Sequence, residues 1–141
     1  MKNLLLIAVF VTGLFTTNAQ TTSEEGVTIT VTIDKVKSNN GKVLFALHTE
    51  ETFMKAKPVQ TSETKIEDNK VKVTFTNVPK GTYAILCVHD ENDNGQMDMQ
   101  ENGMPLEDYG ISNNPMSFGP PEFGSAKFEV ADTDVALKIV F

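Results

Sequence analysis

Residues 27–33 read Val-Thr-Ile-Thr-Val-Thr-Ile, an alternation of apolar and hydroxyl side chains that runs without a break. Successive side chains of a β-strand point to opposite faces, so this pattern predicts a half-buried strand. Residues 43–47 repeat the alternation, and Asn-Gly at 40–41 lies between the two runs. Because Asn and Gly both tolerate positive φ, this pair favours a tight hairpin between the two strands.

The same period of two continues through the rest of the chain. Alternating runs fall at 71–76, 126–130 and 135–141, and a seventh strand is expected near 64–67. Residues 83–88 are nearly all apolar, which predicts a central strand covered on both faces. Cys87 lies in this run as the only cysteine, so it is expected to be a buried core residue without a disulfide partner. A short helix is expected only at 50–56.

Many short strands separated by turns predict an all-β fold, with one antiparallel β-sandwich or barrel of about seven strands. Residues 1–19 predict a secretory signal peptide, because a lysine near the start precedes an apolar run too short for a comfortable transmembrane helix. We expect cleavage between Ala19 and Gln20. This leaves a short extension over 20–26 and a single domain over 27–141. The expected location is therefore secreted or periplasmic, with no membrane span after cleavage.

The negative charge is concentrated in one segment. The chain has 12 Lys, no Arg and a net charge of −7. No Lys lies between Gly81 and Ala126, a stretch that holds eight Asp and Glu residues. Carboxylates gathered in this way repel one another unless a cation neutralises them. The acidic balance and the lack of Arg argue against nucleic acid or an anionic membrane surface as the partner.

Residues 90–101 match the twelve-position calcium-loop pattern D-x-[DN]-x-[DN]-G-x5-E without a mismatch. Calcium takes about six to eight oxygen ligands, which this loop can supply. Gly95 at position 6 would allow the sharp turn. The expected ligands are the side chains at positions 1, 3, 5, 9 and 12 and the carbonyl at position 7: Asp90, Asn92, Asn94, Asp98, Glu101 and Gln96. The alternative is a solvated acidic loop that aids solubility.

A long stretch without a convincing strand, 91–124, contains this loop. Loops longer than about 15 residues are usually functional or disordered. Calcium would order the first third, and burial of aromatic side chains would pin the rest against the sandwich. A strand is expected before position 1 where an EF-hand has a helix, and Asn-Gly-Met-Pro at 102–105 stops a helix after position 12. We therefore expect a calcium loop on a β-scaffold rather than an EF-hand.

Several short motifs follow one another in the second half of the chain. They are Gly-Thr-Tyr-Ala at 81–84, His-Asp-Glu-Asn at 89–92, Gly-Met-Pro at 103–105, Tyr-Gly-Ile-Ser-Asn-Asn at 109–114 and Phe-Gly-Pro-Pro at 118–121. In this order the chain resembles the bacterial family catalogued as domain of unknown function 2141, over roughly Val27 to Phe141. The resemblance implies a small exported envelope protein with no established activity and an immunoglobulin- or transthyretin-like sandwich.

The resemblance also implies that part of the loop is one shared feature, made of His89, Asp90, Asn92, Asn94, Gly95 and Asp98. Glu101 departs from the family's pattern. Glu107 is the substitute closing ligand if the chain folds back through Gly103 and Pro105. We expect His89 to orient the loop through a hydrogen bond to its backbone or to a ligating carboxylate.

The leading functional hypothesis is a calcium-stabilised binding module for an envelope glycan or protein, because loops on rigid sandwiches commonly carry binding. Its candidate contacts are Tyr109, Asn113, Asn114 and Phe118. The alternative for these four is structural, with the aromatic rings in a small core and the Asn residues in turns. A module that is only structural, with the metal as a stabiliser, is the other form of this hypothesis.

The competing hypothesis is a metal-dependent or carboxylate-based hydrolase of envelope or extracellular glycans. In it, His89 beside Asp90 would act as acid–base machinery, or zinc would be held with the help of His48. No nucleophile motif or phosphate loop accompanies these residues. Adjacent strand residues also face opposite sides. We therefore expect a binding or structural module rather than an enzyme.

Overall fold

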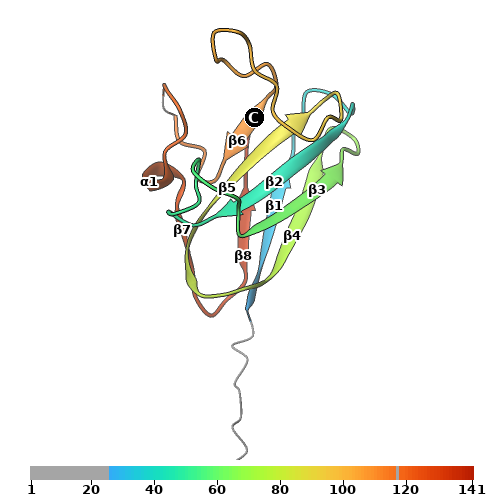
Figure 1. Ribbon diagram of the computed structural model, residues 1–141. Helices are drawn as coiled ribbons and strands as arrows, with labels where there is room; N and C mark the ends of the chain where they lie inside the picture. Colours follow the sequence, from blue (N-terminus) through green and yellow to red (C-terminus); the bar gives the residue numbers. More distant parts are fainter. Residues whose placement is uncertain (1–25, 117) are drawn as a thin grey trace, which may run out of the picture.

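The computed structural model describes residues 26–116 and 118–141, which form two β-sheets packed face to face (Figure 1). The first sheet has the order β4-β1-β8. Its strands are β1 at Val27–Ile33, β4 at Val71–Val78 and β8 at Val135–Lys138. β1 pairs with β4 antiparallel and with β8 parallel.

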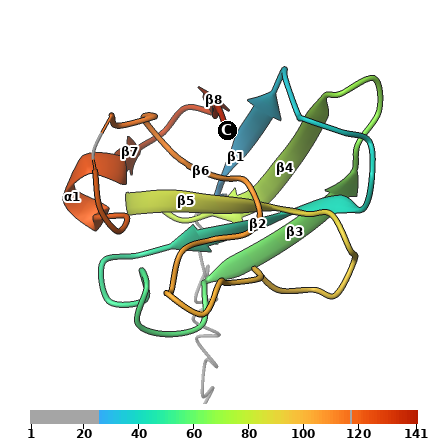
Figure 2. The same ribbon diagram turned by 90° about the horizontal axis from the view of Figure 1, so that it is seen from above.

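The second sheet has the order β3-β2-β5-β6, with β7 paired to the start of β5. Its strands are β2 at Lys42–His48, β3 at Gln60–Lys65, β5 at Gly81–Asp90, β6 at Tyr109–Ile111 and β7 at Phe128–Val130. All of these pairs are antiparallel. Viewed from above, β1, β4 and β8 form one layer and β2, β3 and β5 the other (Figure 2). The predicted all-β sandwich is confirmed.

The core lies between the two sheets. The alternating apolar side chains of β1 all point into it, and Phe45 and Phe75, from opposite sheets, are among the largest fully buried side chains. Cys87 belongs to this cluster, as predicted, and its Sγ donates to the Gly110 carbonyl at 3.3 Å. Burial raises the pKa of the Cys87 thiol, which keeps it protonated and unreactive.

β5 occupies the middle of the second sheet, as its apolar run predicts. Its inner face packs in the main core. Its outer face is covered over part of its length by a second cluster that includes Phe53, Ala84, Ile111 and Ala126. Leu86, further along the outer face, is only half-buried. The expectation of burial on both faces therefore holds for the first half of β5 and only partly for the second.

Asn40 and Gly41 do not form the predicted hairpin, because β1 and β2 lie in different sheets. The left-handed backbone at Gly41 is present, with φ of 66°. A Cβ there would lie 1.9 Å from the Asp90 carbonyl oxygen, so this position requires glycine. An Asn-Gly pair sets the conformation of a turn but not the partner of the next strand. Both edges of β1 are already taken by β4 and β8.

The predicted helix at 50–56 is a series of turns, in which the N–H groups of Phe53 and Ala56 donate to the carbonyls of Thr49 and Thr52. The α-helix in the described residues is α1 at Phe123–Ala126, a single turn that the sequence analysis missed. The strand expected at 64–67 begins earlier, as β3 at Gln60–Lys65. β3 carries no apolar side chain, so a search for apolar alternation underestimates it.

The stretch 91–124 is less irregular than expected, because it contains β6 and the first half of α1. β6 is only three residues long, too short to show an alternation. Its Gly110 packs closely, since a Cβ there would lie 2.6 Å from Cγ2 of Ile139. Residues 91–108 thus form one excursion that begins at the end of β5. The excursion ends at β6, which pairs with β5.

The predicted signal peptide at 1–19 lies outside the described residues. Within 26–116 and 118–141, no helix has the length and apolar character needed to cross a membrane.

Candidate metal centre

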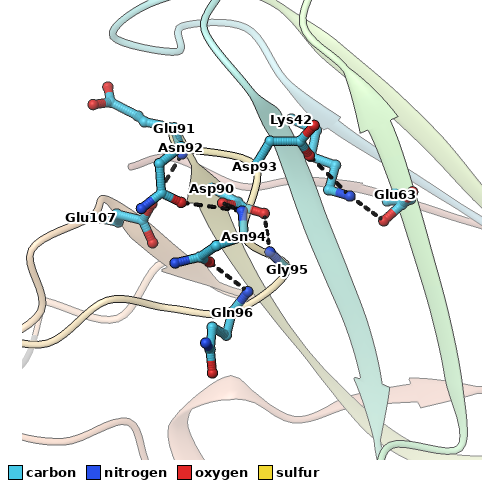
Figure 3. Close-up of polar contacts among 10 residues, drawn as sticks. All are labelled: Lys42, Glu63, Asp90, Glu91, Asn92, Asp93, Asn94, Gly95, Gln96 and Glu107. Carbon is cyan, nitrogen blue, oxygen red and sulfur yellow. Dashed lines mark hydrogen bonds and ion pairs between the residues drawn. The ribbon is translucent and has the colours of Figure 1, made fainter.

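The Asp90 side chain is the centre around which the loop turns. It lies at the end of β5 and is fully buried, at 0% exposure. One carboxylate oxygen accepts the N–H of Asn94 at 3.0 Å, and the other accepts the N–H of Gly95 at 2.8 Å (Figure 3). Gly95 has φ of 82°, so the sharp turn expected at position 6 is present. A buried carboxylate needs this compensation, because its desolvation is costly.

The side chains at positions 3, 5 and 9 meet one another. The amide Nδ2 of Asn94 donates to Oδ1 of Asp98 at 2.8 Å, and that of Asn92 donates to Oδ2 of the same carboxylate. The Oδ1 atoms of Asn92 and Asn94 accept the N–H groups of Asn94 and Gln96, at 3.2 and 3.0 Å. The loop therefore brings two amides to the Asp98 carboxylate, close to the buried Asp90.

Glu107 ties the returning chain to the loop. One of its oxygens accepts the N–H of Glu91 at 3.0 Å, and the other accepts the N–H of Asp98 at 3.1 Å. Glu101, in contrast, is exposed in the turn between Gln100 and Gly103. The chain does fold back through Gly103 and Pro105, so the acid that it brings beside the loop is Glu107.

The positively charged side chain of Lys42, which no sequence pattern singles out, lies at the edge of the loop. Nζ of Lys42 lies 3.0 Å from Oε2 of Glu63 and 3.1 Å from Oδ1 of Asp93 (Figure 3). These two carboxylates, Glu63 foremost, raise the pKa of Lys42. Lys42 faces Asp90 in the β2–β5 pairing. No sequence signal links residues 48 positions apart, because only the strand register brings them together.

His89 points away from the loop that follows it. Its ring is buried, stacks on Phe141 with centroids 6.2 Å apart, and has Nε2 2.9 Å from the Asn40 carbonyl oxygen. Its Nδ1 has no hydrogen-bond partner among the described residues and lies 3.7 Å from Oε1 of Glu91. His89 thus donates a hydrogen bond to the 38–41 turn rather than to the loop backbone or to a candidate ligand carboxylate.

The two histidines are not brought together. In the β2–β5 register His89 faces Val43, whereas His48 lies five residues further along β2 and faces Ala84. At about 3.4 Å per residue, five residues correspond to roughly 17 Å. Within the described residues, no three His, Cys, Asp or Glu side chains converge in a way that could hold a metal. A cation in the loop would therefore depend on amide and carbonyl oxygens as well as carboxylates.

The sequence model of a family described as an uncharacterised protein conserved in bacteria, DUF2141, matches residues 31–138. The chain belongs to this family. The match contains the whole loop and the acids around it, so the candidate metal centre lies within the DUF2141 domain.

Other comparisons with known proteins add little to this DUF2141 assignment. Among solved structures, a pilus-presented adhesin (Cpa) is similar to the chain at 14% sequence identity, with a TM-score of 0.27. The similarity covers 82% of this chain and 26% of the adhesin chain, so the chain spans about a quarter of the adhesin's length. None of the curated proteins matches the chain.

The four candidate ligand contacts of this DUF2141 chain lie in two different settings. The Asn113 amide donates to the Lys127 carbonyl at 2.7 Å, and the Asn114 amide donates to the Lys138 carbonyl at 2.8 Å. Both residues have positive φ. These amides therefore hold backbone segments together. Tyr109 and Phe118 instead line one cavity, with Phe118 fully exposed.

Proposed function

We propose that the protein is an exported β-sandwich of the bacterial envelope that binds one calcium ion in the loop 90–107 and uses the ordered loop for recognition. The observation that supports this proposal is the fully buried Asp90 carboxylate, around which the loop turns. A buried negative charge is stable when a cation or several donors compensate it. No ion pair is formed by Asp90 within the described residues.

The donor set suits a hard cation. Asp90 and Asp98 offer carboxylate oxygens, and Asn92 and Asn94 offer amide oxygens next to them. In the structure the two amides turn their nitrogens to Asp98. A half-turn of each amide group would bring its oxygen towards a cation beside Asp98, in exchange for the hydrogen bonds that Oδ1 accepts from the N–H groups of Asn94 and Gln96. Glu107 supplies the closing carboxylate, because it already contacts both arms of the loop.

The proposed consequence of calcium binding is that the excursion between β5 and β6 is held in one conformation. The excursion is exposed over most of its length and rich in acids. Neutralisation by calcium would stabilise one conformation of it and present Tyr109 and Phe118 to an envelope glycan or protein. For a loop of this kind on an extracellular module, a Kd on the order of 10⁻⁴–10⁻³ M is expected.

Thermal unfolding of the purified protein in EDTA, and then in millimolar calcium, magnesium or zinc, tests the calcium site. Millimolar calcium reaches about 10 times the expected Kd, and a ligand at that concentration that binds only the folded state adds about 1.4 kcal/mol. For a domain of this size we expect Tm to rise by several degrees with calcium. The rise should disappear in Asp90→Asn.

The matched control is Asp132→Asn, which also removes one negative charge. Asp132 lies in the connection between β7 and β8 and forms an ion pair with Lys80. This connection is at the opposite end of the sandwich from the loop (Figure 1). The control should keep the full calcium response. The proposal fails if saturating calcium leaves Tm unchanged, or if both variants lose the response equally.

Export is tested separately from calcium binding. We expect the intact mass of protein recovered outside the cytoplasm to correspond to a chain that begins at Gln20. Recovery of that material with Met1 at its start would contradict cleavage of the proposed signal peptide.

A further inference from the structure

The methionines of this chain gather on one surface. Met54, Met97, Met99 and Met104 line a single cavity of about 510 Å³, together with Tyr109 and Phe118. Met116, two residues before Phe118, is fully exposed and does not line the cavity. Apart from Met1, which lies outside the described residues, these five are all the methionines of the chain.

This placement is unusual for methionine, which normally fills gaps inside hydrophobic cores. Neither buried cluster of the described residues contains a methionine. Met54, Met99 and Met104 are instead 59%, 54% and 58% exposed. Exposed apolar side chains gathered into one patch usually mark a binding site.

Three segments of the chain bring the four methionines to this cavity. Met54 comes from the connection between β2 and β3, and the other three come from the two arms of the 91–108 excursion. The arms pair through a bridge between Met99 and Pro105 and through the Gln100 N–H, which donates to the Met104 carbonyl at 2.7 Å. The paired arms therefore place Met99 opposite Pro105 and Met104 opposite Gln100.

Met97 and Met99 flank Asp98 in the sequence. Asp98 contacts the amides of the loop, whereas both methionines line the cavity. The arm around Asp98 thus contributes to both the methionine-lined cavity and the oxygen-rich loop, through different residues. Each can be changed without replacing a donor of the other.

The chemistry of the cavity favours a soft cation. Thioether sulfur is a soft ligand that selects Cu(I), whereas calcium and magnesium require oxygen ligands. The surroundings favour a cation over an anion, because no Lys lies between Gly81 and Ala126 while eight Asp and Glu do. We propose that this cavity is a Cu(I) site in which thioether sulfurs of Met54, Met97, Met99 and Met104 are the ligands.

Methyl NMR on protein labelled at the methionine εCH₃ groups tests this proposal, with Cu(I) added anaerobically. We expect the methyl resonances of the four cavity methionines to shift and to saturate at one equivalent of Cu(I). The Met116 resonance should stay in place and serves as the internal control. Cu(I) that moves no methyl resonance, or that moves Met116 as strongly as the others without saturation, would overturn the proposal.

A variant that lacks three of the four cavity thioethers separates coordination from apolar contact. Met97→Leu, Met99→Leu and Met104→Leu together keep the apolar volume of the cavity and remove three sulfur atoms. Loss of a single supporting contact at a metal site costs about 10–100-fold in affinity, so Cu(I) affinity should fall by at least about 100-fold. Competition with bicinchoninate measures this change. Met116→Leu should leave the affinity unchanged.

The leucine variant should retain the thermal unfolding profile and the calcium response of the unmodified protein, because it replaces no oxygen donor. Unchanged Cu(I) affinity in that variant would exclude the thioether site. Failure of the calcium proposal would appear instead as a missing response to calcium while the methyl shifts with Cu(I) persist. The two proposals can therefore fail independently.

Discussion

The Nε2 atom of His89 lies 2.9 Å from the carbonyl oxygen of Asn40, so the imidazole joins the end of β5 to the turn that follows β1. The His89 ring is buried, and its other ring nitrogen has no hydrogen-bond partner among the described residues. Since a carbonyl can only accept, Nε2 carries the proton and donates it. The residue that precedes the candidate ligands therefore holds the connection between the two sheets.

Replacement of His89 by phenylalanine should destabilise the fold. His89→Phe keeps an aromatic ring against Phe141 but leaves the Asn40 carbonyl without its donor. We expect a loss of about 1–3 kcal/mol in the free energy of unfolding, measured by urea denaturation. Asn40→Ala is the matched control, because it keeps the main-chain carbonyl and should change stability by less than about 0.5 kcal/mol. Equal losses in both variants would contradict the role given to this bond.

Glu107→Gln and Glu101→Gln distinguish the two candidate closing ligands. Glu107 accepts two backbone N–H groups, from Glu91 and Asp98, whereas Glu101 is exposed in a turn. We expect Glu107→Gln to cost about 1–2 kcal/mol of stability in urea, because an amide accepts at only one of the two positions. The same variant should weaken the calcium-dependent rise in Tm. If Glu101→Gln alone weakens it, the ligand at position 12 is Glu101.

Burial lowers the pKa of His48, against the smaller opposing effect of its contact with Thr52. The folded protein therefore holds His48 neutral at a pH where the unfolded chain already binds a proton. The contribution of neutral His48 to the free energy of unfolding is complete above about pH 6.5. It is lost as the pH falls towards the lowered pKa. We expect His48→Gln to lose less stability than the unmodified protein between about pH 7 and pH 5. Parallel urea-denaturation profiles for the two proteins would exclude this linkage.

Two glycines with positive φ should respond differently to alanine. Gly41 has φ of 66° and its added Cβ would lie 1.9 Å from a backbone oxygen, whereas Gly95 has φ of 82° and open space around it. Gly95→Ala should cost about 1–2 kcal/mol, from backbone conformation alone. Gly41→Ala should cost clearly more, because the strand end at Asp90 must also move. Comparable unfolding free energies for the two variants would contradict the close approach at Gly41.

Strands with an apolar face were predictable from the sequence, because alternation reports burial directly. β1, β2 and β4 follow from their own residues. β3 and β6 were underestimated or missed, since one is an all-polar edge strand and the other is only three residues long. The partner of each strand was not predictable either, as the Asn40–Gly41 turn illustrates.

In the candidate metal centre, contacts between residues close in sequence were predictable, whereas contacts between distant segments were not. The turn at Gly95 and the gathering of Asn92, Asn94 and Asp98 depend on residues close in sequence. The contact of Lys42 with Asp93 depends on the register of β2 against β5. The cavity methionines likewise come from separate segments of the chain. The spacing of residues within one segment therefore does not predict that they line the same cavity.

The parallel pairing of β1 with β8 separates the two ends of the domain. Both strands run in the same direction, so the start of β1 and the end of β8 lie at opposite poles of the sandwich (Figure 1). The last residue, Phe141, stacks on His89 beside the loop. An affinity tag or surface linker fused before β1 would leave the loop and the methionine-lined cavity open to solution. The same tag fused after Phe141 would crowd them, so immobilisation through either end offers a simple way to expose or block this pole of the molecule.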